Sequence, residues 1–434
     1  MQTDFFYTKT KGIKGRIKER IKDFIVTELD EQGTECTLWL NEETLDELQK
    51  LEIPENPKEC KFLWMEMQKF NLDVNEAIRR IARFNGVSKK RITYAGVKDK
   101  RAITSQKICF FKPEIQRLKE FKSKFVKLGK AEWKKEKLRI GMLKGNKFEI
   151  TIRKIELEKK TKKRKGKAEK EIKETEKKEE IKELETRIKN CFKEMEKGIP
   201  NYFGEQRFGG IRKVSHLVGK EFIKGNIKEG VMLYLTHTNE SEEEEIRNAR
   251  NKLKETGNYA IALKEFPLKF RYERGILDHL NSHEEDFVGA FRVLPKALRY
   301  MFVHAYQSFL FNKIIEERIN SGIGLEKTEG EILVNGLASA PLIGFETVFA
   351  EGKTGEIEKK VFEEEDIELK QFYVKEMKEM SSKGARKEIV LFPENLELKE
   401  ISEDEFEEGK LKAKISFYLP KGNYATTVLK EIMK

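Results

Sequence analysis

The chain of 434 residues can bury a large hydrophobic core and form two or three domains, which excludes a single small binding module. Its 88 Lys and Arg residues against 76 Asp and Glu residues give a formal net charge of +12, which favours a polyanionic partner such as nucleic acid. No apolar run is long enough to span a bilayer, so the sequence predicts a soluble, cytoplasmic protein without a membrane partner.

The first half of the chain alternates strand-like and helix-like patterns. Strands are predicted at Asp23–Glu28, Cys60–Phe70 and Ala102–Phe111, and two more within Leu138–Ile155, separated by a turn at Gly145–Asn146. A helix is predicted to begin at Asp73, with Glu76 at the capping-box position, and to end at Gly86. Its buried face would consist of Val74, Ala77, Ile78, Ile81 and Ala82. These elements predict an α+β fold with a mixed, largely antiparallel sheet.

The second half is mostly helical. Lys159–Lys178 is a low-complexity charged stretch without an apolar stripe, typical of a solvated helix or linker. Apolar residues at helical spacing then predict a helix that ends near Gly198, so that residues 159–200 form a charged helical insertion. Helical patterns continue at 216–229, 242–256 and 295–320, and residues 415–434 return to strand, turn and short helix.

The segment Thr93–Gln106, TYAGVKDKRAITSQ, carries the strongest chemical signal. It sets one acid, Asp99, among Lys98, Lys100 and Arg101 on a turn between two strands. Neighbouring cations favour the ionised form of a carboxylate and fix its direction, which suits a nucleophile or a base. Without further context, such a turn is more often simply solvated.

This segment resembles the catalytic signature AGxKDxxAxTxQ of the pseudouridine synthase D family. The chain supplies its residues as Ala95, Gly96, Lys98, Asp99, Ala102, Thr104 and Gln106. The resemblance implies that Asp99 is the single catalytic aspartate of an enzyme that isomerises a uridine in tRNA, with position 13 of the D-arm as the target. Such an enzyme must take the uridine out of its stack.

The segment NYFGEQRFG, which begins at Asn201, resembles the second signature of the family. The resemblance implies that Phe203 stacks on the loose uracil and that Asn201 orients Asp99 by a hydrogen bond. Standing alone, the aromatic residues here would be read as core residues around a glycine turn.

A weaker resemblance covers IKERIKDFIVTE, which is similar to the family's IKxxPEDFxVxE. Ile21 and Lys22 replace the proline and the acid after it, but Lys18 and Phe24 are present. The resemblance implies that Lys18 pairs with Asp99 and that Phe24 packs in the substrate pocket. Their alternatives are an exposed lysine and a plain core residue.

The helical segment His304–Asn312 resembles the family's inserted domain, and LPKGNYATTVLKEI resembles its C-terminal segment. The resemblance therefore implies a discontinuous catalytic domain, residues 1–213 with 396–434, and an insertion domain, residues 214–395, that closes over the RNA. Basic residues beside the two signatures are candidate RNA contacts, namely Lys100, Arg101, Arg207, Arg212 and Lys213. We expect a monomer.

The sequence supports neither a metal nor a cofactor. The four cysteines form no Cys-x-x-Cys pair, the five histidines show no metal-ligand spacing, and no phosphate-binding or dinucleotide fingerprint occurs. The high content of Lys and Glu indicates a thermophilic source.

Two other functions remain open. An RNA-binding or ribosome-assembly protein could keep the fold without the activity, and a nucleosidase could use an acid beside an aromatic stack. The sequence also leaves open whether Asp99 attacks the anomeric carbon of ribose or abstracts the neighbouring proton.

Overall fold

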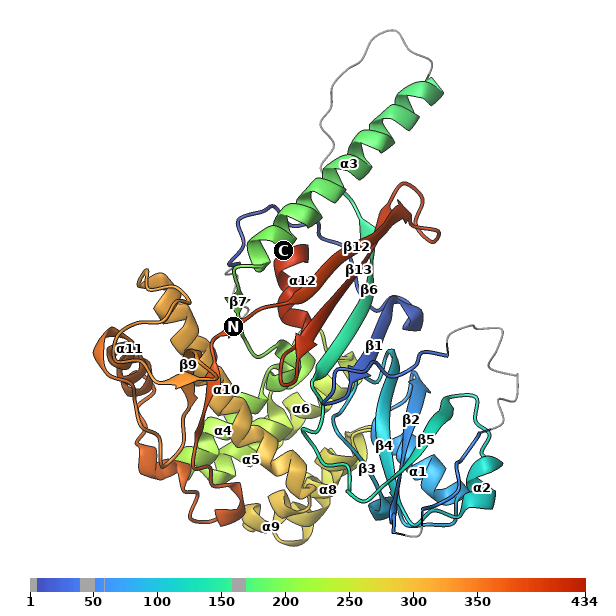
Figure 1. The fold of residues 1–434 in the computed structure, drawn as a ribbon. Coiled ribbons are helices and arrows are strands. Elements are labelled where there is room, and N and C mark those ends of the chain that lie inside the picture. The colour runs from blue at the N-terminus through green and yellow to red at the C-terminus, as the bar shows by residue number, and fades with distance from the viewer. Residues whose placement is uncertain (1–5, 40–50, 58, 158–168) are drawn as a thin grey trace. The chain divides into compact units, whose positions relative to one another are not determined.

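The computed structural model describes residues 6–39, 51–57, 59–157 and 169–434 (Figure 1). In the last of these ranges, side chains are described from Thr175 onward. Two compact units make up the chain: Met1–Gly198 with Phe392–Lys434, and Ile199–Leu391. The boundaries therefore lie earlier than those predicted at 213/214 and 395/396. The physical reason is that β7 (Ile199–Pro200) pairs with β11 (Val390–Leu391), which joins the start of the second unit to its end.

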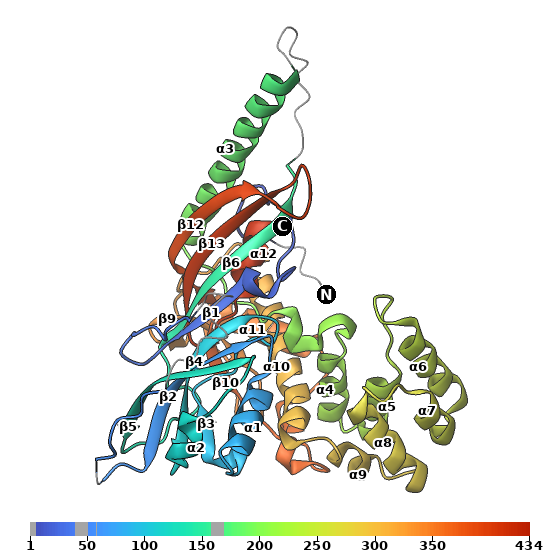
Figure 2. The ribbon, with the colours of Figure 1, turned by 90° about the vertical axis from the view of Figure 1, so that its right-hand side faces the viewer.

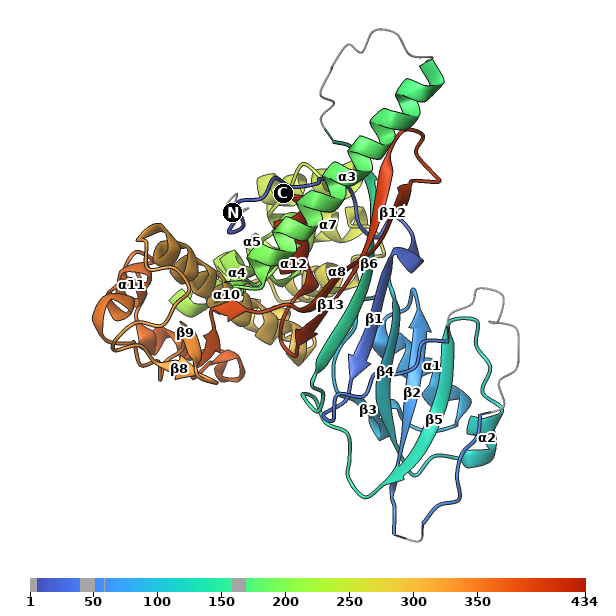
Figure 3. The ribbon, with the colours of Figure 1, turned by 45° about the horizontal axis from the view of Figure 1, so that its top comes forward.

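The first unit is built on an eight-stranded sheet with the order β12-β13-β6-β1-β4-β2-β5, to which β3 adds by pairing with β4 (Figure 3). Only β1 and β4 pair in parallel; the other neighbours are antiparallel. The predicted mixed, largely antiparallel sheet of an α+β fold is thus confirmed. Its strands are β1 (Phe24–Leu29), β2 (Phe62–Phe70), β3 (Ile92–Tyr94), β4 (Ile103–Phe111), β5 (Val126–Lys134), β6 (Gly145–Ile155), β12 (Glu394–Glu403) and β13 (Leu411–Pro420).

The prediction of two strands within Leu138–Ile155 was wrong. One strand, β6, begins at Gly145, which pairs with Leu29 of β1 and Pro420 of β13. A Cβ atom at Gly145 would collide with the carbonyl oxygen of Leu419 and the hydroxyl group of Tyr418. The glycine therefore permits a close approach between strands rather than a turn.

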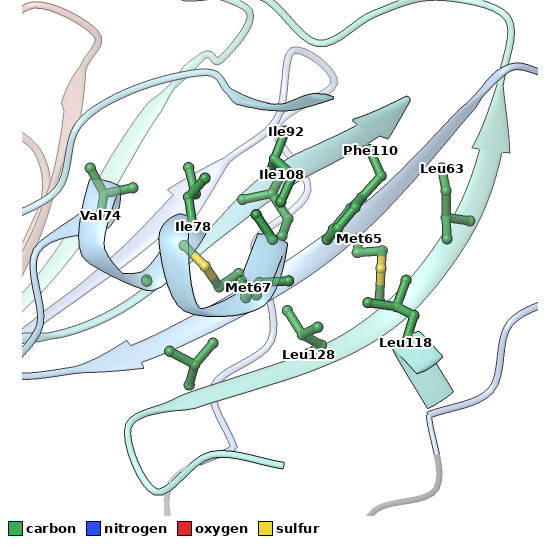
Figure 4. Packing of buried hydrophobic residues seen from close by; sticks show 14 of the residues in the cluster. Leu63, Met65, Met67, Val74, Ile78, Ile92, Ile108, Phe110, Leu118 and Leu128 are labelled. Atoms are coloured by element: carbon green, nitrogen blue, oxygen red, sulfur yellow. The ribbon is translucent and has the colours of Figure 1, made fainter. Parts of the chain in front are cut away.

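Helix α1 (Val74–Phe84) covers part of this sheet, and its amphipathic pattern explains why. Asp73 caps it by accepting hydrogen bonds from the amides of Asn75 and Glu76, whereas the Glu76 carboxylate pairs with arginines of the helix rather than closing a capping box. The five predicted face residues are buried. Figure 4 shows Val74 and Ile78 on the helix beside a hydrophobic cluster supplied by β2, β4 and β5, including Met67, Ile108, Phe110 and Leu128.

The other helices of the first unit are α2 (Ile115–Lys119), α3 (Glu169–Met195) and α12 (Ala425–Met433). The apolar residues that predicted α3 are all buried: Leu184, Ile188, Cys191, Phe192 and Met195. Residues 159–168 of the predicted charged insertion lie outside the described residues.

The second unit is mainly helical, with a three-stranded antiparallel sheet of order β10-β9-β8 (Figure 2). Gly225, with a φ of +85°, divides the predicted helical stretch 216–229 into two helices. The elements are α4 (Ser215–Lys224), α5 (Ile227–Thr236), α6 (Glu244–Thr256), α7 (Tyr259–Glu265), α8 (Arg271–Ser282), α9 (Phe287–Arg292), α10 (Lys296–Asn320), α11 (Gly352–Glu363), β8 (Leu333–Val334), β9 (Leu337–Leu342) and β10 (Ala385–Glu388).

Short 3₁₀ helices connect these elements, at Ile21–Asp23, Lys89–Arg91, Glu205–Phe208, Gly210–Arg212, Leu369–Phe372 and Lys378–Met380. Among the described residues, no helix is both long and apolar enough to cross a membrane.

We predict that Ile81→Ala lowers the free energy of unfolding by about 2–5 kcal/mol, because the side chain is fully buried between α1 and the sheet. Urea denaturation measures the change. The control is Ile140→Ala, whose side chain is 72% exposed and whose change should stay within about 0.5 kcal/mol. Equal effects of the two substitutions would contradict the assignment of this core.

Candidate active site

Asp99 lies on the loop that joins β3 to β4, residues 95–102. Its side chain is 30% exposed, and Oδ1 is 2.6 Å from Nζ of Lys18. The carboxylate is thus held by a charge-assisted hydrogen bond while it keeps an accessible side. The pairing of Lys18 with Asp99 that the resemblance implied is present in the structure.

Lys18 has a strained backbone conformation, and its side chain lies against an aromatic ring. Its φ of +58° lies in the left-handed region, which costs a non-glycine residue on the order of 1–3 kcal/mol. Nζ lies 4.1 Å from the ring centroid of Phe24, and that ring is 1% exposed and packs edge-on against Phe148. In this structure Phe24 supports Lys18, while its contact with a substrate stays a prediction.

The cations adjacent to Asp99 in sequence do not contact its carboxylate, contrary to the prediction. Lys98 turns inward, and its Nζ forms a buried ion pair with Glu28 of β1 at 2.5 Å. Arg101 donates to the backbone oxygen of Glu19 at 3.0 Å, and Lys100 is exposed. Successive side chains of the loop point in different directions, so the ammonium on the carboxylate comes from Lys18.

Most of the signature residues around Asp99 fix the loop rather than take part in chemistry. Gln106 donates from Nε2 to the carbonyl oxygen of Gly96 at 2.9 Å, and the carbonyl oxygen of Ala102 accepts from the amide of Asn71 at 3.1 Å. The Lys98–Glu28 pair ties the middle of the loop to β1. Such ties on both sides keep the carboxylate in one place, which a reacting group needs.

Lys69 is a site residue that the sequence reading missed. It is the second-last residue of β2, its side chain is 0% exposed, and its Nζ donates to the backbone oxygen of Asp99 at 2.5 Å. Burial lowers the pKa of Lys69 to about 8, although Asp99 and Asp73 oppose the shift, and Lys98 adds to it. A signal existed in the sequence, because Lys69 continues the alternation of core-facing residues Leu63, Met65 and Met67.

Asn201 and Phe203 lie in the second unit. Asn201 is buried beside β10: its amide donates to the carbonyl oxygen of Ile389 at 2.8 Å, and Nδ2 donates to that of Glu388 at 3.1 Å. Oδ1 of Asn201 has no hydrogen-bond partner among the described residues, and Nδ2 keeps a second hydrogen. The predicted bond from Asn201 to Asp99 stays a prediction.

The backbone of Phe203 is bracketed by one side chain. Asn312 of α10 accepts from the amide of Phe203 at 2.9 Å and donates to its carbonyl oxygen at 3.0 Å. The neighbouring Phe311 packs edge-on against the Phe203 ring, with 5.4 Å between centroids. The apolar helical segment His304–Asn312 therefore fixes the second signature, a role that its sequence did not show.

Some of the basic residues predicted to contact RNA lie near carboxylates of the protein, and others do not. Arg212 is 13% exposed and lies near the carboxylates of Glu273 and Glu242, at 3.5 and 3.8 Å, and Lys213 pairs with Glu205 at 2.8 Å. Within the described residues, no carboxylate lies within ion-pair distance of Arg207, Lys100 or Arg101. Those three cations are the better candidates. No group of three or more metal-ligating side chains occurs in the described ranges.

A family model for tRNA pseudouridine synthase D (TruD) matches residues 1–337 and 335–432. The chain belongs to the tRNA pseudouridine synthase D family. A probable tRNA pseudouridine synthase D from Methanosarcina acetivorans is 37% identical over 99% of this chain and 95% of its own length. Another, from Methanopyrus kandleri, is 38% identical over 85% of this chain and 84% of its own.

A crystal structure described as TruD from Methanosarcina mazei superposes with a TM-score of 0.74 at 35% identity, and the match covers 99% of this chain and 96% of that one. Family, relatives and fold agree, so the protein is a pseudouridine synthase, an isomerase.

We predict that Lys69→Met changes the pH dependence of stability. Below pH 8 the folded wild type buries a cation; between about pH 8 and the ordinary pKa of 10.5 the unfolded chain binds more protons than the folded one. The free energy of unfolding of the wild type should therefore rise relative to that of the variant as pH increases from 7 to 10. Urea denaturation at several pH values measures this difference.

The exposed Lys100→Met serves as the control and should track the wild type at every pH. Parallel pH profiles for the wild type and Lys69→Met would show that the pKa of Lys69 does not differ between the folded and unfolded states.

Proposed function

We propose that Asp99 is the single catalytic acid of this pseudouridine synthase. The observation that carries the proposal is the Lys18–Asp99 pair at 2.6 Å, on a loop tied to the sheet by Lys69, Lys98 and Gln106. A carboxylate that is held by a cation yet partly exposed can attack C1′ of ribose or take the proton from C2′. Both routes break the bond between C1′ and N1 of uracil.

We also propose roles for the other predicted residues. Phe203 stacks on the uracil while it turns from N1 to C5, Asn201 orients Asp99 through Nδ2, and Phe24 keeps Lys18 directed at the acid and borders the substrate. The positions of Asn312 and Phe311 support a fixed Phe203. Fixed partners matter because rate depends on preorganised geometry.

The proposed substrate is tRNA, with the uridine at position 13 of the D-arm as its target. The family description and the names of the relatives support tRNA, and the resemblance of the signatures supports the position. The second unit, Ile199–Leu391, would bind the RNA and close over it. Because the chain has a formal net charge of +12, its affinity for tRNA should fall steeply as the salt concentration rises.

We predict that Asp99→Asn abolishes pseudouridine formation while tRNA affinity stays within about twofold, because the acid is required for chemistry rather than binding. The assay maps pseudouridine to the nucleotide on an unmodified tRNA transcript. Asp366→Asn is the matched control, since the side chain of Asp366 is fully exposed in the second unit. It should behave as the wild type.

The same assay tests the alternatives. Tight RNA binding without product from the wild type would identify an inactive RNA-binding protein, and release of free uracil would identify a nucleosidase. Product at another nucleotide would overturn the proposed position alone.

A further inference from the structure

Lys387, in β10 of the second unit, forms no ion pair with a carboxylate among the described residues. Its Nζ is buried and has no hydrogen-bond partner among the described residues. The nearest acid in sequence, Glu388, instead accepts from Nδ2 of Asn335 at 2.6 Å. Burial lowers the pKa of Lys387 to about 8, which Glu388 only partly opposes. Burial of a cation without an ion-pair partner destabilises the folded state, so its presence requires a reason.

The surroundings of Nζ are aromatic. It lies 5.5 Å from the ring centroid of Phe203 and 5.6 Å from that of Phe311. A second cation, the guanidinium of Arg207, lies 5.4 Å from the Phe203 centroid; it donates to the hydroxyl of Ser308 at 3.0 Å and has no carboxylate within ion-pair distance among the described residues. Two uncompensated cations therefore approach one aromatic ring.

Other basic residues close to Lys387 in sequence do form ion pairs with carboxylates. Arg386 has the buried carboxylate of Glu358 as its partner, and Lys383 pairs with Glu346 at 3.0 Å in an exposed position. Lys387 differs from both, because among the described residues it forms neither an ion pair nor a hydrogen bond through Nζ. The missing partner is best supplied by a ligand that carries negative charge and lies against Phe203.

We propose that Lys387 binds the uracil and neutralises the negative charge that develops on it when the glycosidic bond breaks. This inference rests on the proposed role of Phe203 as the ring on which the uracil stacks. It assigns a second function to the same ring environment: the aromatic ring holds the base, and the ammonium group, 5.5 Å from the ring centroid, stabilises the charged state of the base.

The electron balance of the reaction requires such a group. When the C1′–N1 bond breaks, its electron pair stays on uracil, and C1′ either gains a bond to an oxygen of Asp99 or forms a double bond to C2′ as Asp99 takes the C2′ proton. On either route uracil bears one negative charge, spread over N1, O2 and O4. The charge on uracil is consumed when C5 bonds to C1′. On the first route the C1′–O bond to Asp99 breaks in that step and frees the carboxylate, and on the second route Asp99 returns the proton to C2′. C5 then loses its proton and N1 gains one.

An ammonium group fixed in a dry, aromatic environment suits this task. It needs no reorganisation when the charge appears, and its interaction with an anion is stronger there than in water. Loss of one such preorganised group typically lowers the rate about 10²–10³-fold. Binding of the neutral uridine before reaction would change little, because the interaction grows only as the bond breaks.

The test compares full-length wild type with Lys387→Met under single-turnover conditions on an unmodified tRNA transcript, together with tRNA affinity at several salt concentrations. We expect a rate about 10²–10³-fold lower at saturating enzyme, an affinity within about twofold, and a melting temperature equal to or above that of the wild type, since an unpaired buried charge is removed. Lys387→Arg, which keeps the charge, should recover at least part of the rate. Lys383→Met is the matched control and should leave rate, affinity and melting temperature unchanged.

Three results would overturn the inference. A wild-type rate for Lys387→Met would show that the charge is not used. A normal rate at saturation with weaker binding, and a salt dependence reduced by about one phosphate contact, would assign Lys387 to the RNA backbone. A lower rate that accompanies a lower melting temperature and is not recovered by Lys387→Arg would make the residue structural.

Phe203→Leu separates this inference from the role on which it rests. If Phe203→Leu lowers the rate and Lys387→Met does not, only the role of Lys387 is overturned. If neither lowers the rate, the stacking role of Phe203 is overturned with it.

Discussion

The parallel pairing of β1 with β4 is the constraint on which the candidate active site depends. Ile25 lies opposite Ile103 in this pair, whereas the other strand neighbours in the sheet run antiparallel. Parallel strands begin at the same edge of a sheet, so the segment before β1 and the loop before β4 come together. Lys18 lies in the first and Asp99 in the second, which brings into contact two residues that are 81 positions apart.

The same pairing explains the buried ion pair beside the acid. Glu28 in β1 accepts from Nζ of Lys98 and from the backbone amide of Lys107 in β4. A carboxylate that ties the loop, the parallel strand and its own strand together leaves few ways to displace Asp99 without breaking a buried charge pair. Loss of one partner of such a pair typically costs about 3–5 kcal/mol. The loop is thus rigid for electrostatic as well as geometric reasons.

Sequence patterns predicted what local periodicity and motifs encode. The buried face of α1 follows from its spacing, and the position of Asp99 on a loop between two strands follows from the strand patterns on either side. The predictions that were wrong concern features that depend on neighbours in the folded structure. Gly145 looked like a turn residue because the close approach of Leu419 and Tyr418 cannot be read from Gly-Asn, and the cations beside Asp99 looked like its partners because their directions were unknown. That Nζ of Lys387 has no hydrogen-bond partner among the described residues is likewise visible only once the chain is folded.

Lys69 and Lys387 show one principle with two different outcomes. Burial lowers the pKa of each to about 8, so each charge destabilises the folded state near neutral pH. The destabilisation by the buried charge of Lys69 is offset by other parts of the protein. Its Nζ donates to the backbone oxygen of Asp99, and the charges of Asp99 and Asp73 stabilise the ammonium group. Lys387 has no such acceptor among the described residues. A cation that is compensated holds the protein's own loop, whereas one that is not is available to a substrate. The partner of Lys69 is therefore the loop that carries Asp99, whereas the partner that we propose for Lys387 is the uracil base during the reaction.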